Sequence, residues 1–253
     1  MTIVNRYYRG VVLLAVFAIT AITLYFLDPI AQDLAYHRFS DCRTFFGIPH
    51  FMDVVSNIPF VIIGFMGIRL SRKACRKEPM AFFLMSFVVF VGVFFTGLGS
   101  AIYHYMPNNF ALIFDRLPMT LVFTAFFATI IYDYVDRRVG AWVFYTLLVA
   151  GIYSIFYWYY TEITGTGDLR LYAFIQFFPI VAVPLILVFY KSSELYTKLI
   201  LFVFFSYALA KLCEHFDRQI FEFLGFISGH TIKHLVSAMA IYFIFKIYKK
   251  RLS

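Results

Sequence analysis

The chain has 253 residues, of which 62% are hydrophobic and 22% aromatic. A soluble domain of this length could not bury so much apolar surface, so the composition excludes a soluble globular protein and predicts a polytopic membrane protein. The three cysteines lie far apart, without the paired spacing of a disulfide framework or a cysteine-type zinc site. The formal net charge of +8 suggests either nucleic-acid binding or membrane topology, and its placement decides between them.

Eight apolar segments are long enough to span a bilayer, which requires about 20 residues. The sequence therefore predicts an all-α, polytopic membrane helical bundle. In chain order the segments cover roughly residues 10–28, 54–70, 80–104, 112–132, 140–160, 170–190, 196–213 and 229–247.

The first segment is expected to be either an uncleaved anchor or a signal peptide. Its apolar stretch, from Val11 to Leu27, is longer than the usual core of a signal peptide. The pattern of small residues around Ala31 is a weak cleavage signal. These features favour the anchor, and the signal peptide stays as the alternative.

The basic residues fall on alternate connections between the predicted helices. By the positive-inside rule these connections are cytoplasmic, and so are both termini. The charge is therefore explained by membrane topology, and nucleic acid is not an expected partner. The residues concerned are Arg6, Arg9, Arg69, Arg72, Lys73, Arg76, Lys77, Arg137, Arg138, Lys191, Lys198, Lys246, Lys249, Lys250 and Arg251.

Five polar residues, distant in sequence, are placed by this topology at the outer ends of their helices. His104 ends the third segment with Ser100 one turn before it, Asp115 opens the fourth, and His230 and His234 open the eighth. Residues at i and i+4 share a helix face, so His230 and His234 can offer two nitrogens to one metal ion, and His104 can offer a third. Three protein ligands and a water are the pattern of catalytic zinc, which lowers the pKa of that water to about 7. Asp115 is then the candidate base, and Ser100 a candidate hydrogen-bond donor to the water or to an oxyanion.

Each of these residues alone has an ordinary structural interpretation. Paired histidines four residues apart are weak evidence for a metal, Asp115 could cap its helix or pair with Arg116, and Ser100 could bond its own helix backbone. The coincidence of all five at one depth is what favours a metal site. Mid-depth positions carry almost no carboxylates or imidazoles, which argues against a channel or transporter.

Two of the segments just described, GSAIYHYMPNNFALIFDRLPM and GHTIKHLVSA, resemble the alkaline ceramidase family, as does FMDVVSNIPFVIIG from Phe51. That family belongs to a superfamily of seven-helix membrane hydrolases, which includes the progestin/adipoQ receptors and the Per1-type GPI-remodelling proteins. The similarity covers about residues 50–245. It implies a seven-helix, ceramidase-like hydrolase domain at residues 50–253, preceded by an N-terminal transmembrane anchor and outer loop at residues 1–49.

The resemblance implies a zinc ion held by His104, His230 and His234, with Ser100 and Asp115 beside it as catalytic residues. In alkaline ceramidases such a site hydrolyses the linear amide bond of ceramide to a sphingoid base and a fatty acid. The expected partner is therefore a ceramide-like membrane lipid. Compact loops further suggest a bacterial inner membrane, with the site on the extracytoplasmic side.

One departure from the family concerns calcium. The animal enzymes carry a cluster of acidic calcium ligands before and at the start of the first core helix. This chain keeps Asp41 and Asp53 there, but His50 stands where a glutamate is expected. Oxygen-rich coordination is hard to assemble from these residues, which argues against a calcium site.

The remaining polar residues of the outer side have ordinary expectations. His37, His50 and His215 are expected to be interfacial histidines, with a contact near the metal as the alternative for His50. Lys211 and Glu214 should form a local ion pair, with Asp217 as a candidate head-group contact. Lys233 should point away from the histidines and extend to the interface.

Two other functions stay open at this point. A zinc hydrolase could instead cleave an ester, of a glycerolipid or a GPI-type lipid. A seven-helix receptor of the progestin/adipoQ type would carry the same motif, although the short cytoplasmic loops leave little surface for a signalling partner.

Overall fold

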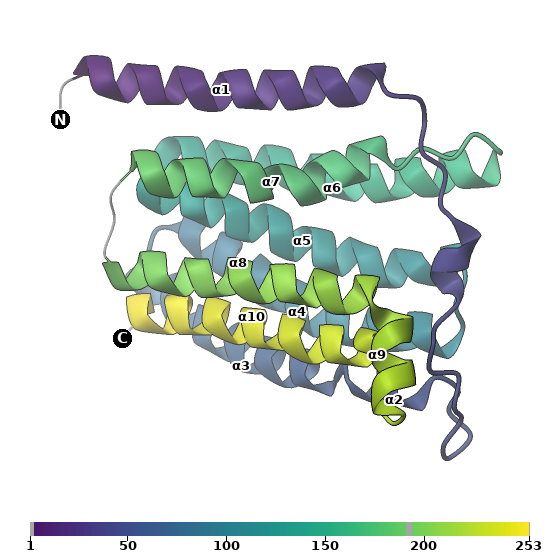
Figure 1. Ribbon diagram of the computed structural model, residues 1–253. Helices are drawn as coiled ribbons and strands as arrows, with labels where there is room; N and C mark the ends of the chain where they lie inside the picture. The colour runs from purple at the N-terminus through teal and green to yellow at the C-terminus, as the bar shows by residue number, and fades with distance from the viewer. Residues whose placement is uncertain (1–2, 191–193, 253) are drawn as a thin grey trace. The chain divides into compact units, whose positions relative to one another are not determined.

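The computed structural model describes residues 3–190 and 194–252, and Figure 1 shows that over these ranges the chain is built from helices and their connections. Eight spans are long and apolar enough to cross a membrane, so the predicted all-α polytopic bundle is confirmed. The elements are α1 (Ile3–Phe26), η1 (Leu34–His37, a 3₁₀ helix), α2 (Phe51–Val55), α3 (Ile58–Lys77), α4 (Met80–Tyr105), α5 (Asn109–Tyr134), α6 (Arg137–Ile163), α7 (Arg170–Phe189), α8 (Glu194–His215), α9 (Asp217–Leu224) and α10 (Gly229–Leu252).

Each predicted apolar segment corresponds to one span of the structure. Most helices run past their apolar windows, as α3 does to Lys77, because the backbone stays helical where polar side chains reach the interface. The second span, Phe51–Lys77, comprises α2 and α3 and is interrupted at Ser56 and Asn57. Lys191, one of the basic residues used for the topology, lies outside the described residues.

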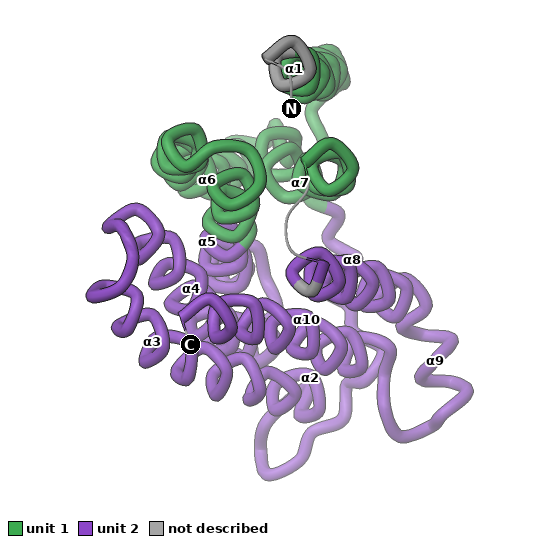
Figure 2. Tube along the Cα trace, turned by 90° about the vertical axis from the view of Figure 1, so that its left-hand side faces the viewer, with its two compact units in different colours: residues 1–32, 123–193 green, residues 33–122, 194–253 purple. Residues whose placement is uncertain are grey.

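The chain divides into two compact units, which Figure 2 shows in green and purple. Unit 1 comprises residues 1–32 and 123–193, and unit 2 comprises residues 33–122 and 194–253. Helix α5 contributes its first part to unit 2 and its second part to unit 1. The predicted functional division at residues 49 and 50 stays a prediction.

In unit 1, α7 packs against α1 and α6, and the connection between α6 and α7 holds the segment that follows α1. Asp168 accepts hydrogen bonds from the guanidinium of Arg170, at 2.9 Å and 2.8 Å, and these bonds lower the pKa of the Asp168 carboxyl. The same guanidinium donates to the carbonyls of Tyr25 and Leu27. A backbone bond of 2.9 Å from Leu169 to Ile30 completes this attachment.

In unit 2, α10 packs against α3 and α8, and α4 packs against α3. Aromatic rings fill this core: Tyr248 of α10 contacts Phe82 and Phe90 of α4, with ring centroids 5.7 Å and 5.3 Å apart. All three side chains are buried. The packing aligns α4 with α10, so His104 of α4 faces His230 and His234 of α10.

Candidate metal centre

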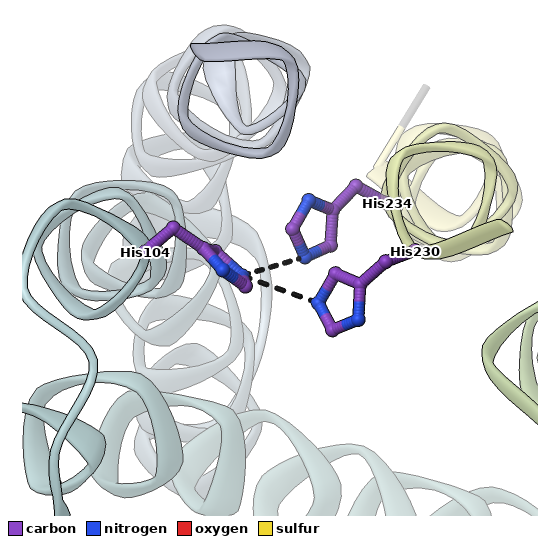
Figure 3. A group of neighbouring side chains, drawn as sticks. All are labelled: His104, His230 and His234. Atoms are coloured by element: carbon purple, nitrogen blue, oxygen red, sulfur yellow. Dashed lines mark hydrogen bonds between the residues drawn. The ribbon is translucent and has the colours of Figure 1, made fainter. Parts of the chain in front are cut away.

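Three buried histidines from two helices converge on one point in unit 2 (Figure 3). Nε2 of His104 lies 3.3 Å from Nε2 of His230 and 3.3 Å from Nε2 of His234. The three ligand nitrogens all lie within 4.8 Å of one another, and each residue is at most 5% exposed. The predicted three-histidine group is therefore present and could hold a metal ion.

Two of the three distances between these nitrogens suit tetrahedral coordination. Imidazole nitrogens bind zinc at about 2.0–2.1 Å, which places two ligands of a tetrahedron about 3.3 Å apart. The two distances from His104 have this value. Three ligands from the protein leave a fourth position for a small molecule or a substrate group.

The side chain of His234 is oriented by a residue of the turn between α2 and α3. Pro59 has no N–H to donate to the carbonyl four residues earlier, so the helix breaks there and Ser56 and Asn57 form a turn. The Ser56 hydroxyl donates to the Asp53 carbonyl at 3.0 Å and lies 2.7 Å from Nδ1 of His234. A hydroxyl has one proton, so Nδ1–H of His234 donates to Ser56, and its Nε2 lone pair faces the cluster.

His230 is held from two sides. Its backbone N–H donates to Oδ1 of Asp217 at 2.7 Å, and its Nε2 lies 2.8 Å from Nζ of Lys233. An ammonium group has donors only, so Nε2 of His230 is the acceptor, and its single lone pair is engaged by Lys233; a metal ion bound to this nitrogen would take the place of that hydrogen bond. The prediction that Lys233 points away to the interface is wrong, because its ammonium also donates to Oε1 of Glu214 at 3.0 Å.

His104 supplies the clearest sign that the group suits a cation. Its Nδ1 is buried and has no hydrogen-bond partner among the described residues. Its Nε2 faces two acceptor nitrogens, an arrangement that a positive ion at the centre would stabilise. Phe39 packs over the outer side, with its ring centroid 4.5 Å from His104 and 4.9 Å from His230.

Ser100 and Asp115 are brought together by a close approach of α4 to α5. A Cβ atom on Gly99 would come within 1.8 Å of the carbonyl oxygen of Phe114, so only glycine lets the two backbones meet there. The next residue of each helix is Ser100 and Asp115, so the close approach of the two backbones brings this pair together. Ser100 is buried and lies one turn before His104 on α4, and the catalytic roles of Ser100 and Asp115 stay predictions.

A second glycine, Gly229, lets the start of α10 approach the end of α8 closely. A Cβ atom on Gly229 would come within 2.2 Å of the Cys213 carbonyl oxygen and 2.7 Å of Cα of Asp217. This contact brings α10 against the end of α8, which places His230 over the Asp217 carboxylate. The carboxylate also accepts from the backbone N–H of Ser40, so Asp217 joins the outer loop to α10.

The loop before α2 is held by polar contacts within unit 2. His37 is hydrogen-bonded to Tyr103 and Asn109, both at 2.9 Å, so the expectation of an ordinary interfacial residue is wrong for His37. His50 contacts the Asp41 carbonyl through Nδ1 at 3.1 Å and packs on Phe39. His215 is exposed and contacts the ring of Phe216, as expected of an interfacial histidine.

The two carboxylates considered for calcium are engaged by donors of the protein. Asp41 accepts two side-chain hydrogen bonds from Arg43, at 2.8 Å and 2.7 Å; these outweigh the effect of burial and lower the pKa of the Asp41 carboxyl. Oδ1 of the buried Asp53 accepts from Thr231 at 2.6 Å and from Ser228 at 3.2 Å. Asp53 therefore fastens α2 to the start of α10.

An apolar cavity of about 340 Å³ lies next to the polar turn between α2 and α3. It is lined mainly by apolar side chains, among them Met52, Val55, Pro59 and Leu235, together with Ser56 and Thr231. Ser56 thus contacts the cavity on one side and His234 on the other. The sequence motifs did not point to Ser56; the Ser-Asn-x-Pro order at the start of a membrane span is the signal that could have found it.

No protein-family model matches the chain, and no curated protein matches it. The resemblance to the alkaline ceramidase family stays a prediction.

Proposed function

We propose that this multi-pass membrane protein is a zinc-dependent hydrolase that cleaves the amide bond of ceramide or a related lipid. The products would be a sphingoid base and a fatty acid. The observation that supports the proposal is the convergence of three buried imidazole Nε2 atoms, with Ser100 one helical turn before His104 and Asp115 adjacent to it on α5. Zinc suits this donor set because it accepts neutral imidazoles in tetrahedral geometry.

Zinc bound by these histidines would supply Lewis acidity and an activated water near neutral pH. The protein supplies the rest of the chemistry. The Asp115 carboxylate would take a proton from the attacking water and pass it to the leaving nitrogen as the C–N bond breaks. The Ser100 hydroxyl could donate to the oxygen that becomes negative.

A lipid substrate is supported by the surroundings of the site. The histidines lie within membrane spans, and the apolar cavity beside Ser56 offers room for part of a hydrocarbon chain. Eight crossings would leave both termini on one side. The placement of the basic residues supports the cytoplasm as that side, which would put the site on the extracytoplasmic side. The compact loops support a bacterial inner membrane.

The experiment that tests the function is lipid hydrolysis by the purified, zinc-replete chain, followed by mass spectrometry. Ceramide and diacylglycerol should be offered in parallel, with His104→Ala as the inactive control. Release of sphingoid base by the wild type alone is the expected result. Cleavage of diacylglycerol alone would indicate that the substrate bond is an ester and not an amide. Binding of either lipid without cleavage would favour a receptor.

A further inference from the structure

Beside the metal group, two lysines share one carboxylate. Glu214 of α8 pairs with Lys211 at 2.7 Å through Oε2, as predicted, and with Lys233 of α10 at 3.0 Å through Oε1. Within residues 3–190 and 194–252, Glu214 is the only carboxylate paired with either lysine. The cluster Lys211, Glu214 and Lys233 therefore carries one excess positive charge.

Two members of this cluster are mostly buried. The side chains of Lys233 and Glu214 are 17% and 18% exposed, whereas Lys211 is 42% exposed. The nearby Asp217 carboxylate accepts from the backbone of Ser40 and His230 instead. Charged groups at the depth of membrane spans are costly unless they are paired, so Lys233 is the group that gains most from an additional anion.

Lys233 also lies close to the candidate metal position, where the carbonyl group of a bound lipid would react. Its Nζ is 2.8 Å from Nε2 of His230, one of the three nitrogens that face the metal position. A metal ion bound to that nitrogen would displace this hydrogen bond and leave the ammonium beside the metal with a proton to donate to an anion. Glu214 fixes the ammonium from the opposite side, and Lys211 fixes Glu214. The lysine is thus preorganised at the edge of the site, and charge-assisted bonds from an ammonium to a carboxylate are among the stronger hydrogen bonds in proteins.

We propose that Lys233 is the anion-binding residue of this site and that it binds the carboxylate of a long-chain fatty acid. The choice of a fatty acid rests on the proposed function, in which it is the released acyl product. Before release, the same ammonium would face the acyl carbonyl oxygen as that oxygen gains negative charge. Glu214 and Lys211 are positioning residues that act through Lys233.

The test measures binding by isothermal titration calorimetry, with oleate and the uncharged oleyl alcohol as probes and the full-length, metal-loaded chain in detergent. The wild type should bind oleate at least tenfold more tightly than oleyl alcohol. Lys233→Met and Lys233→Gln should lose this preference and keep their affinity for the alcohol, and Lys233→Arg should retain part of it. Lys198→Met is the matched control, because Lys198 pairs with Glu194 on the exposed surface of the same helix that carries Glu214.

Two results would overturn the inference: equal affinity of the wild type for acid and alcohol, or an unchanged preference for the acid in both uncharged Lys233 variants. Zinc content, measured on each variant, shows whether the metal group survives the substitution. A preference that depends on Lys233 in a chain that cleaves no lipid would contradict only the proposed function. Cleavage of ceramide together with an unchanged preference in the variants would contradict only the role of Lys233.

Discussion

Ser56 and His234 are joined by a 2.7 Å contact between Oγ and Nδ1, across 178 residues of sequence. The serine belongs to the turn that Pro59 forces between α2 and α3, and its own proton goes to the Asp53 carbonyl. The contact therefore fixes which ring nitrogen of His234 faces the metal position. Partners of this kind orient metal-binding histidines and raise their basicity.

Removal of that partner should weaken metal binding without unfolding the chain. Ser56→Ala leaves Nδ1–H of His234 without its acceptor and frees the ring to turn, so we expect zinc affinity to fall about 10- to 100-fold. Competition with a chromophoric chelator measures the zinc affinity of each variant. Ser86→Ala is the matched control, because Ser86 is also buried but bonds the Phe83 carbonyl of its own helix. Equal affinities for the two variants would contradict the role of Ser56.

The close approach at Gly99 should tolerate no side chain. Gly99→Ala places Cβ 1.8 Å from the Phe114 oxygen, so α4 and α5 must separate, at a cost of about 1–3 kcal/mol. Thermal unfolding in detergent should show a lower midpoint. Gly10→Ala serves as the comparison, since nothing lies within 4 Å of its added Cβ and alanine favours a helix. An unchanged midpoint for Gly99→Ala would mean that the helices are not in contact there.

Replacement of Asp115 should reduce the rate of hydrolysis more than it reduces zinc binding. Asp115→Asn keeps the shape of the side chain but removes the base, so hydrolysis should fall by about 10²–10⁴-fold. Metal analysis of the same preparation should show wild-type zinc content, because the three ligands are histidines. Parallel loss of zinc and activity would indicate that Asp115 is a ligand or a structural residue, and not the base.

The ion pair in unit 1 should make stability depend on pH on the acid side. The guanidinium of Arg170 holds the pKa of Asp168 below its usual value of 3.8, so the folded chain favours the ionised carboxylate. This stabilisation is present above pH 3.8 and is lost as the pH falls through the lower, folded pKa. The difference in unfolding midpoint between wild type and Asp168→Asn should therefore be largest above about pH 5 and shrink below 3.8. A difference that stays constant over this range would contradict the assignment.

The eight spans could be read from the sequence because hydrocarbon thickness sets both their length and their apolar composition. The histidine group could also be anticipated, since His230 and His234 share a helix face and topology places His104 at the same depth. The residues that hold these histidines in place could not be anticipated. Ser56, Asp217 and Phe39 reach the histidines through a broken helix and an irregular loop, whose paths depend on tertiary contacts that no periodicity records.

Lys233 shows why composition alone misleads for single residues. A lysine near the end of a membrane helix ordinarily extends to the interface. Here Glu214 lies on the neighbouring helix at the right height, and the ion pair turns the ammonium toward His230. The register between α8 and α10 decides the outcome, and Gly229 sets that register through its contact with Cys213.

The most direct test of the account is the metal content of the purified chain, measured by inductively coupled plasma mass spectrometry on protein that has met no chelator. The account predicts one zinc per chain for the wild type and its loss in His104→Ala, His230→Ala and His234→Ala, while His215→Ala, an exposed histidine, keeps it. Stoichiometric zinc in all three cluster variants, or none in the wild type, would contradict the assignment of these histidines as a metal site.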